Sequence, residues 1–210
     1  GGMVGARRLR LMRALQRLGT PNRAGPGIEA VSLGPISLRL HRPVHAPSGP
    51  HPAILWIHGG GYVLGSAAQD DGLCRHLASA VGAVVAAVDY RLAPEHPFPV
   101  PLQDCHDALV WLASRADVDR RRIAIAGASA GGGLTAALAL LARERGEVRP
   151  VFQLLTYPML DDRTTAGPSA NERDLRLWNT SSNRFGWGAY LGSAPGGRGV
   201  SGLAAPARAD

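Results

Sequence analysis

The residues with the clearest capacity for chemistry are Gly127, Ser129 and Gly131, in the run Gly-Ala-Ser-Ala-Gly. An apolar stretch of strand length precedes this run, and good helix formers follow it. A serine on so sharp a strand-to-helix turn is lifted out of the sheet, and only small residues fit beside it. The helix that follows would aim unpaired N–H groups and the positive end of its dipole at the same point. The pattern therefore predicts that Ser129 acts as a nucleophile.

A short Gly/Ser motif is weak by itself, because ordinary loops also match it. A dinucleotide-binding fingerprint would need glycine where Ser129 stands. A phosphate-binding loop of the Gly-Lys-Ser/Thr type needs lysine, and this chain has none. These two patterns are therefore disfavoured, which leaves the loop and the nucleophile as the competing interpretations.

A second motif, His-Gly-Gly-Gly-Tyr at residues 58–62, follows the apolar run 53–57 directly. Three glycines after a strand let backbone N–H groups approach a ligand closely. In acyl transfer such a loop donates hydrogen bonds to the oxyanion, together with the N–H of the residue after the nucleophile. Alone, the loop is equally well explained as a flexible turn. Two parts of one oxyanion system, in the right order and each after a strand, favour a serine hydrolase.

The elements that must position these motifs alternate along the chain. We expect strands at residues 28–33, 36–42, 53–57, 83–88, 123–126 and 151–156, with the first two forming a hairpin, and helices at 70–81, 102–115 and 130–143. The proline-rich stretch 91–101 is expected to be a loop. Alternation of strands and helices predicts an α/β fold with a mostly parallel sheet.

The N-terminal stretch 4–18 has the pattern of an amphipathic helix. One face would carry Val4, Leu11, Leu15 and Leu18, and the other Arg10, Arg13 and Arg17. We expect this helix to lie over the core as part of a lid, with a membrane-surface or targeting role as the alternatives. Six arginines precede the first acid, Glu29, so the net charge of +7 is local and does not indicate nucleic-acid binding.

The region from residue 161 has weaker core periodicity. Short helices are expected at 171–178 and 183–190, carrying Trp178, Phe185 and Trp187. They suit a cap over an apolar pocket, or equally a surface excursion packed on the core. Cys74 and Cys105 fall in expected helices and are interpreted as buried free thiols.

Composition gives the remaining expectations. The seven histidines show no metal-ligand spacing, so no metal site is predicted. No run of about 18 apolar residues and no secretory signal occur, which predicts a cytoplasmic protein without stable membrane insertion.

The sequence resembles the hormone-sensitive-lipase-like branch of the α/β-hydrolases, the microbial carboxylesterases with an HGGG loop. The matching stretches, in the family's order and spacing, are 58–62, 89–99, 127–132 and 155–161. The resemblance covers roughly residues 28–210 and implies an α/β-hydrolase fold with helices on both faces of the sheet and a small helical cap. It implies an N-terminal cap segment at 1–27, a core at 28–160, a cap insertion at 161–194 and a return to an incomplete core at 195–210.

The resemblance also implies roles for particular residues. Ser129 would be the nucleophile, and the backbone N–H groups of Gly60, Gly61 and Ala130 would form the oxyanion hole. His58 would brace its own loop and would not be a base. The substrates would be small esters with short or medium acyl chains, and no cofactor would be needed.

The chain departs from the family after Ser129. A serine triad needs a base and an acid, and α/β-hydrolases carry them in the order Ser, Asp or Glu, His. No histidine follows Ser129, the last being His106, and Asp161 and Asp162 match the family's cap entrance. We therefore expect a chain that lacks the last strands of the fold along with the acid and base, and that is weakly active or inactive. The strand at 151–156 would then have an unpaired edge that favours self-association.

Two alternatives stay open. An upstream base, His58, His96 or His106, could be recruited by rearrangement. The chain could also be a non-catalytic small-molecule-binding protein, like the plant gibberellin receptor that resembles this family. The intact motif around Ser129 favours the enzyme, because a receptor has less need of a strained nucleophile.

Overall fold

The structure is a computed structural model that describes residues 5–19, 25, 27–43, 49–166 and 178–209. The strands are β1 Ile28–Leu33, β2 Ile36–His41, β3 His51–Ile57, β4 Val84–Asp89, β5 Val118–Ala128 and β6 Phe152–Thr156. The α-helices are α1 Ala6–Gly19, α2 Asp71–Val81, α3 Val100–Ser114, α4 Ala130–Arg145 and α5 Thr180–Leu191, and the short 3₁₀ helices are η1 Ala67–Asp70, η2 Asp162–Thr165 and η4 Pro206–Arg208.

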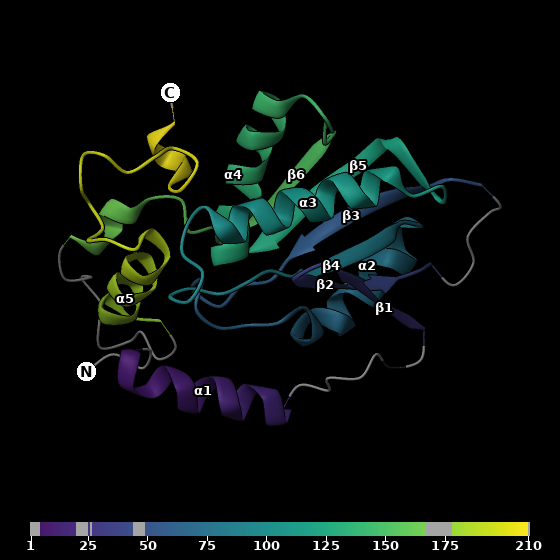
Figure 1. The fold of residues 1–210 in the computed structure, drawn as a ribbon. Coiled ribbons are helices and arrows are strands. Elements are labelled where there is room, and N and C mark those ends of the chain that lie inside the picture. The colour runs from purple at the N-terminus through teal and green to yellow at the C-terminus, as the bar shows by residue number, and fades with distance from the viewer. Residues whose placement is uncertain (1–4, 20–24, 26, 44–48, 167–177, 210) are drawn as a thin grey trace.

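The six strands form one sheet in the order β1-β2-β4-β3-β5-β6 (Figure 1). The β1–β2 and β2–β4 pairs are antiparallel, and the β4–β3, β3–β5 and β5–β6 pairs are parallel. The predicted hairpin is present, with Gly34 at φ +58° in its turn. The α/β fold with a mostly parallel sheet is confirmed.

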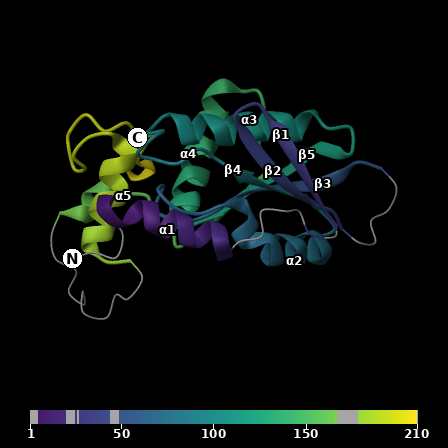
Figure 2. The same ribbon diagram turned by 60° about the horizontal axis from the view of Figure 1, so that its bottom comes forward.

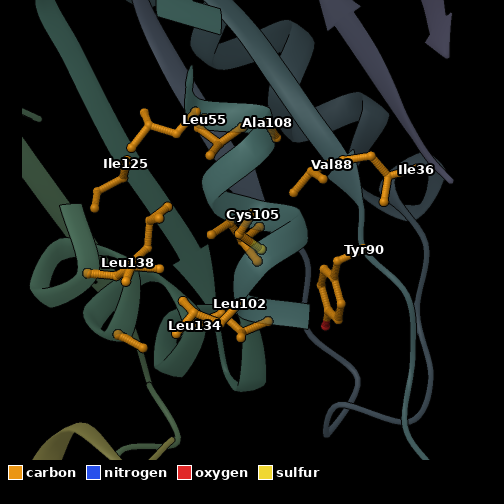
Figure 3. Close-up of a cluster of buried hydrophobic side chains, with 14 of the residues drawn as sticks. Ile36, Leu55, Val88, Tyr90, Leu102, Cys105, Ala108, Ile125, Leu134 and Leu138 are labelled. Atoms are coloured by element: carbon orange, nitrogen blue, oxygen red, sulfur yellow. The ribbon is translucent and has the colours of Figure 1, made fainter. Parts of the chain in front are cut away.

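Side chains alternate between two apolar cores, one on each face of the sheet. Leu55 and Ile57 of β3 point to the larger core under α3 and α4, and Trp56 points to the smaller core under α2. Figure 3 shows part of the larger core, where Leu55 and Ile125 from the sheet meet Leu102, Leu134 and Leu138 from the helices. Both faces of the central strands are therefore covered, which explains their nearly continuous apolar sequence.

Cys74 in α2 and Cys105 in α3 are fully buried and form no disulfide, as predicted. Burial raises the pKa of both thiols above the ordinary value, so neither is a reactive thiolate.

Two expectations about helices need correction. The stretch 91–101 is not a loop throughout, because α3 begins at Val100 with Pro101 in its first turn. Proline is tolerated there, since the first N–H groups of a helix have no intrahelical acceptor. Trp178 is not helical, and the rest of the helix expected at 171–178 lies outside the described residues. The helix expected at 183–190 lies within α5.

The amphipathic pattern predicted α1 correctly as a helix, but the face that carries Leu11, Leu15 and Leu18 is not the one that turns to the core. The side chains turned to the core are Leu9, Met12, Arg13 and Gln16, and Leu9 is 5% exposed. Leu11, Leu15 and Leu18 face outward. Periodicity alone could not show that Arg13 finds acceptors on the core, which are described below. No described helix is both long and apolar enough to cross a membrane.

Candidate active site

Ser129 occupies the strained turn that its motif predicts. It joins β5 to α4 with φ +55° and ψ −117°, a left-handed conformation that is unusual for a residue with a side chain. Its backbone is held on both sides: its N–H donates to Thr156 O at 2.9 Å, and its carbonyl accepts from Met159 N at 2.9 Å and Gly133 N at 3.0 Å. The strain is therefore fixed by surrounding structure, as expected for a presented nucleophile.

The two flanking glycines of the motif are needed for close packing. A Cβ on Gly127 would lie 2.5 Å from Gly131 O, and a Cβ on Gly131 would overlap the carbonyl of Ile57. Because backbone atoms cannot yield as a flexible side chain can, larger residues would force the turn open. The expectation that only small residues fit beside Ser129 is therefore confirmed for both glycines.

The HGGG loop lies directly against this turn. A Cβ built on Gly59 would be 3.0 Å from Ala128 O and 3.4 Å from the Cβ of Ser129. Gly60 and Gly61 have φ of +131° and +61°, so the loop needs glycine conformations next to the serine. Gly60 O accepts from Leu64 N at 2.9 Å, which closes the loop into a tight turn. The structure thus brings together two motifs that lie about 70 residues apart in the sequence.

Three backbone donors near Ser129 remain available. The N–H groups of Gly60, Gly61 and Ala130 donate to no acceptor among the residues that the structure describes. Ala130 begins α4, so its N–H also lies at the positive end of that helix dipole. These are the three groups that the resemblance assigns to the oxyanion hole.

His58 is buried under its own loop. Its ring stacks on Tyr90 with centroids 4.3 Å apart, and its Nδ1 is 2.8 Å from Gly59 O. Tyr90 Oη donates to His58 O at 3.0 Å. Burial lowers the pKa of His58, so the ring is neutral and its Nδ1–H donates to Gly59 O. These contacts are those that a bracing residue needs, and no pattern in the sequence indicated Tyr90 as its partner.

Helix α1 supports the far end of the same loop. Arg13 Nε donates to Val63 O at 2.9 Å, Arg13 Nη2 donates to Ala93 O at 2.7 Å, and Arg13 Nη1 contacts both carboxylate oxygens of Glu95 at 2.8 and 2.9 Å. Gln16 Oε1 accepts from Gly65 N at 3.1 Å. The sequence pattern grouped Arg13 with Arg10 and Arg17 on the face opposite the leucines, and in the structure Arg13 links α1 to the two loops beside the site.

A cavity of about 480 Å³ opens at Ser129. Its lining includes Met159, Trp178 and Trp187, and Asn183 at the rim accepts from Trp178 Nε1 at 3.3 Å. A Cβ on Gly61 would overlap the Trp178 ring, so the indole rests on the HGGG loop. Of the three aromatic residues noted from the sequence, Trp178 and Trp187 line this cavity, whereas Phe185 packs against the hydrophobic core.

The candidate acids are engaged elsewhere. Asp161 caps η2 and pairs with Arg163 at 2.8 Å. Asp162 is fully buried and binds Arg208 at 2.5 and 2.9 Å and Gly196 N at 2.6 Å. Burial alone would raise the pKa of Asp162, but the hydrogen bonds from Arg208 hold it below the ordinary value. Both aspartates therefore serve local structure, in line with their assignment away from the acid's position.

No histidine is among the described residues that line the Ser129 cavity. His106 lines a separate cavity beside Trp111, where its Nδ1 lies 3.0 Å from Arg145 Nη1. His58 is committed to its loop, as described above. Within the described residues, no group of three or more His, Cys, Asp or Glu side chains is arranged to hold a metal ion.

Known proteins resemble this chain at the level of family, sequence and fold. The α/β-hydrolase fold family matches residues 54–210. The esterase LipI of Mycobacterium tuberculosis is 45% identical over 129 residues, which are 60% of this chain and 40% of LipI. The ethyl acetate hydrolase of Pseudomonas putida is 42% identical over 131 residues, which are 60% of this chain and 41% of that enzyme.

A solved structure titled bacterial heroin esterase superposes with a TM-score of 0.84 at 37% identity, covering 96% of this chain and 69% of that one. The matched segments span about two fifths of the length of LipI and the ethyl acetate hydrolase. The resemblance to microbial carboxylesterases is confirmed, and the chain belongs to the α/β-hydrolase fold family.

Proposed function

We propose that this chain carries the nucleophile and oxyanion-binding half of a carboxylic-ester hydrolase. The observation that supports this most strongly is the packing of the HGGG loop against the strained Ser129 turn, with three N–H groups beside it that have no acceptor among the described residues. That arrangement has no structural purpose in a simple loop, because it costs strain at Ser129 and leaves donors without acceptors.

In the proposed reaction, Ser129 Oγ attacks the ester carbonyl carbon and its proton passes to a base. The carbonyl oxygen becomes an oxyanion bound by the N–H groups of Gly60, Gly61 and Ala130. The alcohol leaves with a proton and an acyl-Ser129 ester remains. Water then attacks that ester, releases the carboxylic acid and returns the proton to Ser129.

The proposal includes no metal or organic cofactor. It also includes no base from the cavity, because no histidine is among the described lining residues and Asp161 is paired with Arg163. We therefore propose that residues 1–210 alone turn over esters slowly, at the level that binding and an oxyanion hole give, roughly 10³ to 10⁴ over water.

Small esters with short or medium acyl chains are the proposed substrates. The cavity measures about 480 Å³ and is walled by Trp178 and Trp187, which limits the acyl group that fits. A relative named ethyl acetate hydrolase supports an ester of this size. The division into a core at 28–160 with cap segments at 1–27 and 161–194 is part of the same proposal, as is a cytoplasmic location.

The alternative is a binding protein that keeps the cavity and does not hydrolyse. The absence of histidine from the described lining favours it. The strained φ of Ser129 opposes it, because binding alone does not require that conformation.

A fluorophosphonate probe separates these functions. We expect the chain to be labelled at Ser129, located by peptide mass spectrometry, and labelling to disappear in Ser129→Ala. Ser114→Ala is the matched control, since Ser114 is an exposed serine at the end of α3. Turnover of a chromogenic butyrate ester is measured in parallel, on this chain and on a version extended past Asp210.

Three outcomes are decisive. Weak labelling and negligible turnover, both increased by extension, support the proposal. Labelling of Ser129→Ala equal to the wild type rejects Ser129 as the nucleophile. Rapid Ser129-dependent turnover by the 210-residue chain rejects the missing base and indicates a recruited histidine.

A further inference from the structure

The outer face of α1 carries an apolar stripe that no described element covers. Leu11, Leu15 and Leu18 are 62%, 59% and 86% exposed. At 3.6 residues per turn their side chains fall within roughly 60° of one another around the helix. Figures 1 and 2 show α1 at the periphery of the molecule, with its outer side free of other labelled elements.

This helix is held firmly despite its exposed leucines. Its inner face is fixed by Leu9 in the core and by the contacts of Arg13 and Gln16 with the core loops. The stripe therefore lies on an anchored helix. Its three leucine side chains are in contact with water, which is unfavourable for apolar surface. A surface of this kind marks an interaction site when its apolar residues are contiguous.

Charge on and around the stripe indicates the partner. Arg8 and Arg10 are exposed beside the leucines and form no ion pair with any acid in the described part of the chain. The first 23 residues contain six arginines and no acid. Arg13, by contrast, is neutralised by Glu95. The outer surface of α1 is thus both apolar and cationic.

We propose that the outer face of α1 docks on an anionic lipid surface, with the helix lying flat, its leucines in the acyl-chain boundary and Arg8 and Arg10 against the headgroups. An amphipathic helix with leucines on one side and flanking arginines has the chemistry for this mode. A second copy of the chain fits less well, because the first 23 residues contain no acid, so an α1 helix packed on the stripe would place no carboxylate against Arg8 and Arg10. The docking is peripheral and is independent of the proposed hydrolysis.

Vesicle flotation tests the proposal on the intact chain. We use vesicles of phosphatidylglycerol mixed with phosphatidylcholine, and vesicles of phosphatidylcholine alone. Flotation separates bound protein from any aggregate, which sinks. We expect the wild type to float with the anionic vesicles, less with the neutral ones, and less as salt is raised, because salt screens the arginines.

Three variants assign the surface. The triple variant Leu11→Ser, Leu15→Ser, Leu18→Ser should lower the partition coefficient by about tenfold or more, since it removes the apolar contacts. Arg8→Gln with Arg10→Gln should lower it for anionic vesicles only. Leu73→Ser with Val81→Ser is the matched control, because these residues are exposed apolar side chains on α2. Thermal unfolding of each variant checks that the fold is kept.

Several results would overturn the proposal. One is a wild type that stays at the bottom of the gradient with anionic vesicles. Another is a folded triple leucine variant that floats as well as the wild type. A third is a vesicle-free dimer of the wild type that the leucine substitutions dissociate, since the stripe would then bind a second copy.

Discussion

The two sides of the Ser129 turn are supported very differently. On one side, the HGGG loop is held by stacking of His58 on Tyr90, by Arg13 from α1 and by the Trp178 ring. On the other side, the turn is hydrogen-bonded to Thr156 and Met159, at the end of β6. Strand β6 is the last in the sheet order, and its region leaves large apolar side chains exposed.

The exposed apolar side chains on that second side are Val151 at 65%, Phe152 at 61%, Leu154 at 44% and Tyr157 at 75%. The opposite edge strand, β1, instead alternates half-buried apolar residues with exposed residues such as Glu29 and Ser32. The comparison teaches that the shape of the HGGG loop depends on contacts from three segments far apart in the sequence. The backbone of the Ser129 turn also depends on β6, which has one neighbour in the described sheet.

The largest effect is expected for Gly61→Val, on the side of the Ser129 turn where the HGGG loop lies. Gly61 has φ +61°, and any Cβ there would overlap Trp178, so valine should turn the N–H away. Loss of one oxyanion donor costs about 10² to 10³ in rate. The rate of fluorophosphonate labelling at Ser129 should fall by that factor while the unfolding transition of the core is kept.

Gly72→Ala is the matched control for Gly61, because a Cβ there meets nothing within 4 Å. The double variant Gly61→Val, Trp178→Ala separates the two causes. Full recovery of labelling in the double variant would mean that displacement of the indole, and not loss of the donor, explains the defect.

On the second side, Asp162→Asn should destabilise the region after β6. Asp162 is buried and binds Arg208 and Gly196, so the change leaves a mostly buried Arg208 without its charge partner. We expect a loss of about 3 kcal/mol in the free energy of unfolding at pH 7, measured by urea titration. Asp161→Asn, a more exposed pair with Arg163, should change it by less than about 1 kcal/mol.

The charge of Asp162 also predicts how the free energy of unfolding depends on pH. The folded-state pKa of Asp162 is lowered from the ordinary value of 3.8. The stabilisation that the carboxylate gives to the folded state is therefore fully present above pH 3.8 and is lost as the pH falls below that value. The difference between wild type and Asp162→Asn should shrink as the pH falls from 5 to 3. A difference that stays constant over this range would show that the carboxylate charge is not what stabilises the region.

A smaller effect is expected for Arg13→Ala, which tests whether α1 helps to hold the HGGG loop in place. Removing the guanidinium leaves Val63 O and Ala93 O without their donor and frees the end of the HGGG loop. Labelling at Ser129 should slow roughly tenfold, because small displacements of catalytic groups reduce rates strongly. Arg10→Ala, on the outer face of the same helix, should leave the rate unchanged. Equal labelling rates for both variants and the wild type would show that α1 covers the core without holding the HGGG loop in place.

The smallest effect concerns self-association through β6, which the open edge predicts. Sedimentation velocity at tens of micromolar should show association of the wild type, and Phe152→Lys should weaken it, because a charge at an edge strand opposes pairing. Ser32→Lys at the β1 edge is the control and should have no effect. A wild type that remains a well-dispersed monomer would contradict self-association through β6.

The sequence by itself determined the local elements and the parts of the site that lie within one motif. Gly127, Ser129 and Gly131 predict the turn because its tightness is a local steric property. The apolar runs predict buried strands, and the order of elements predicts the mostly parallel sheet. The periodicity of residues 4–18 likewise predicts α1 as a helix.

Only the tertiary structure decided which groups meet across long stretches of chain. Leu11, Leu15 and Leu18 form the more apolar face of α1, yet the face with Arg13 turns inward, because Val63 O, Ala93 O and Glu95 lie opposite the guanidinium. The contact of Trp178 with Gly61 likewise depends on where the chain returns after β6. Helical periodicity reports which residues share a face, whereas the acceptors that a half-buried arginine requires are set by loops 50 to 82 residues away.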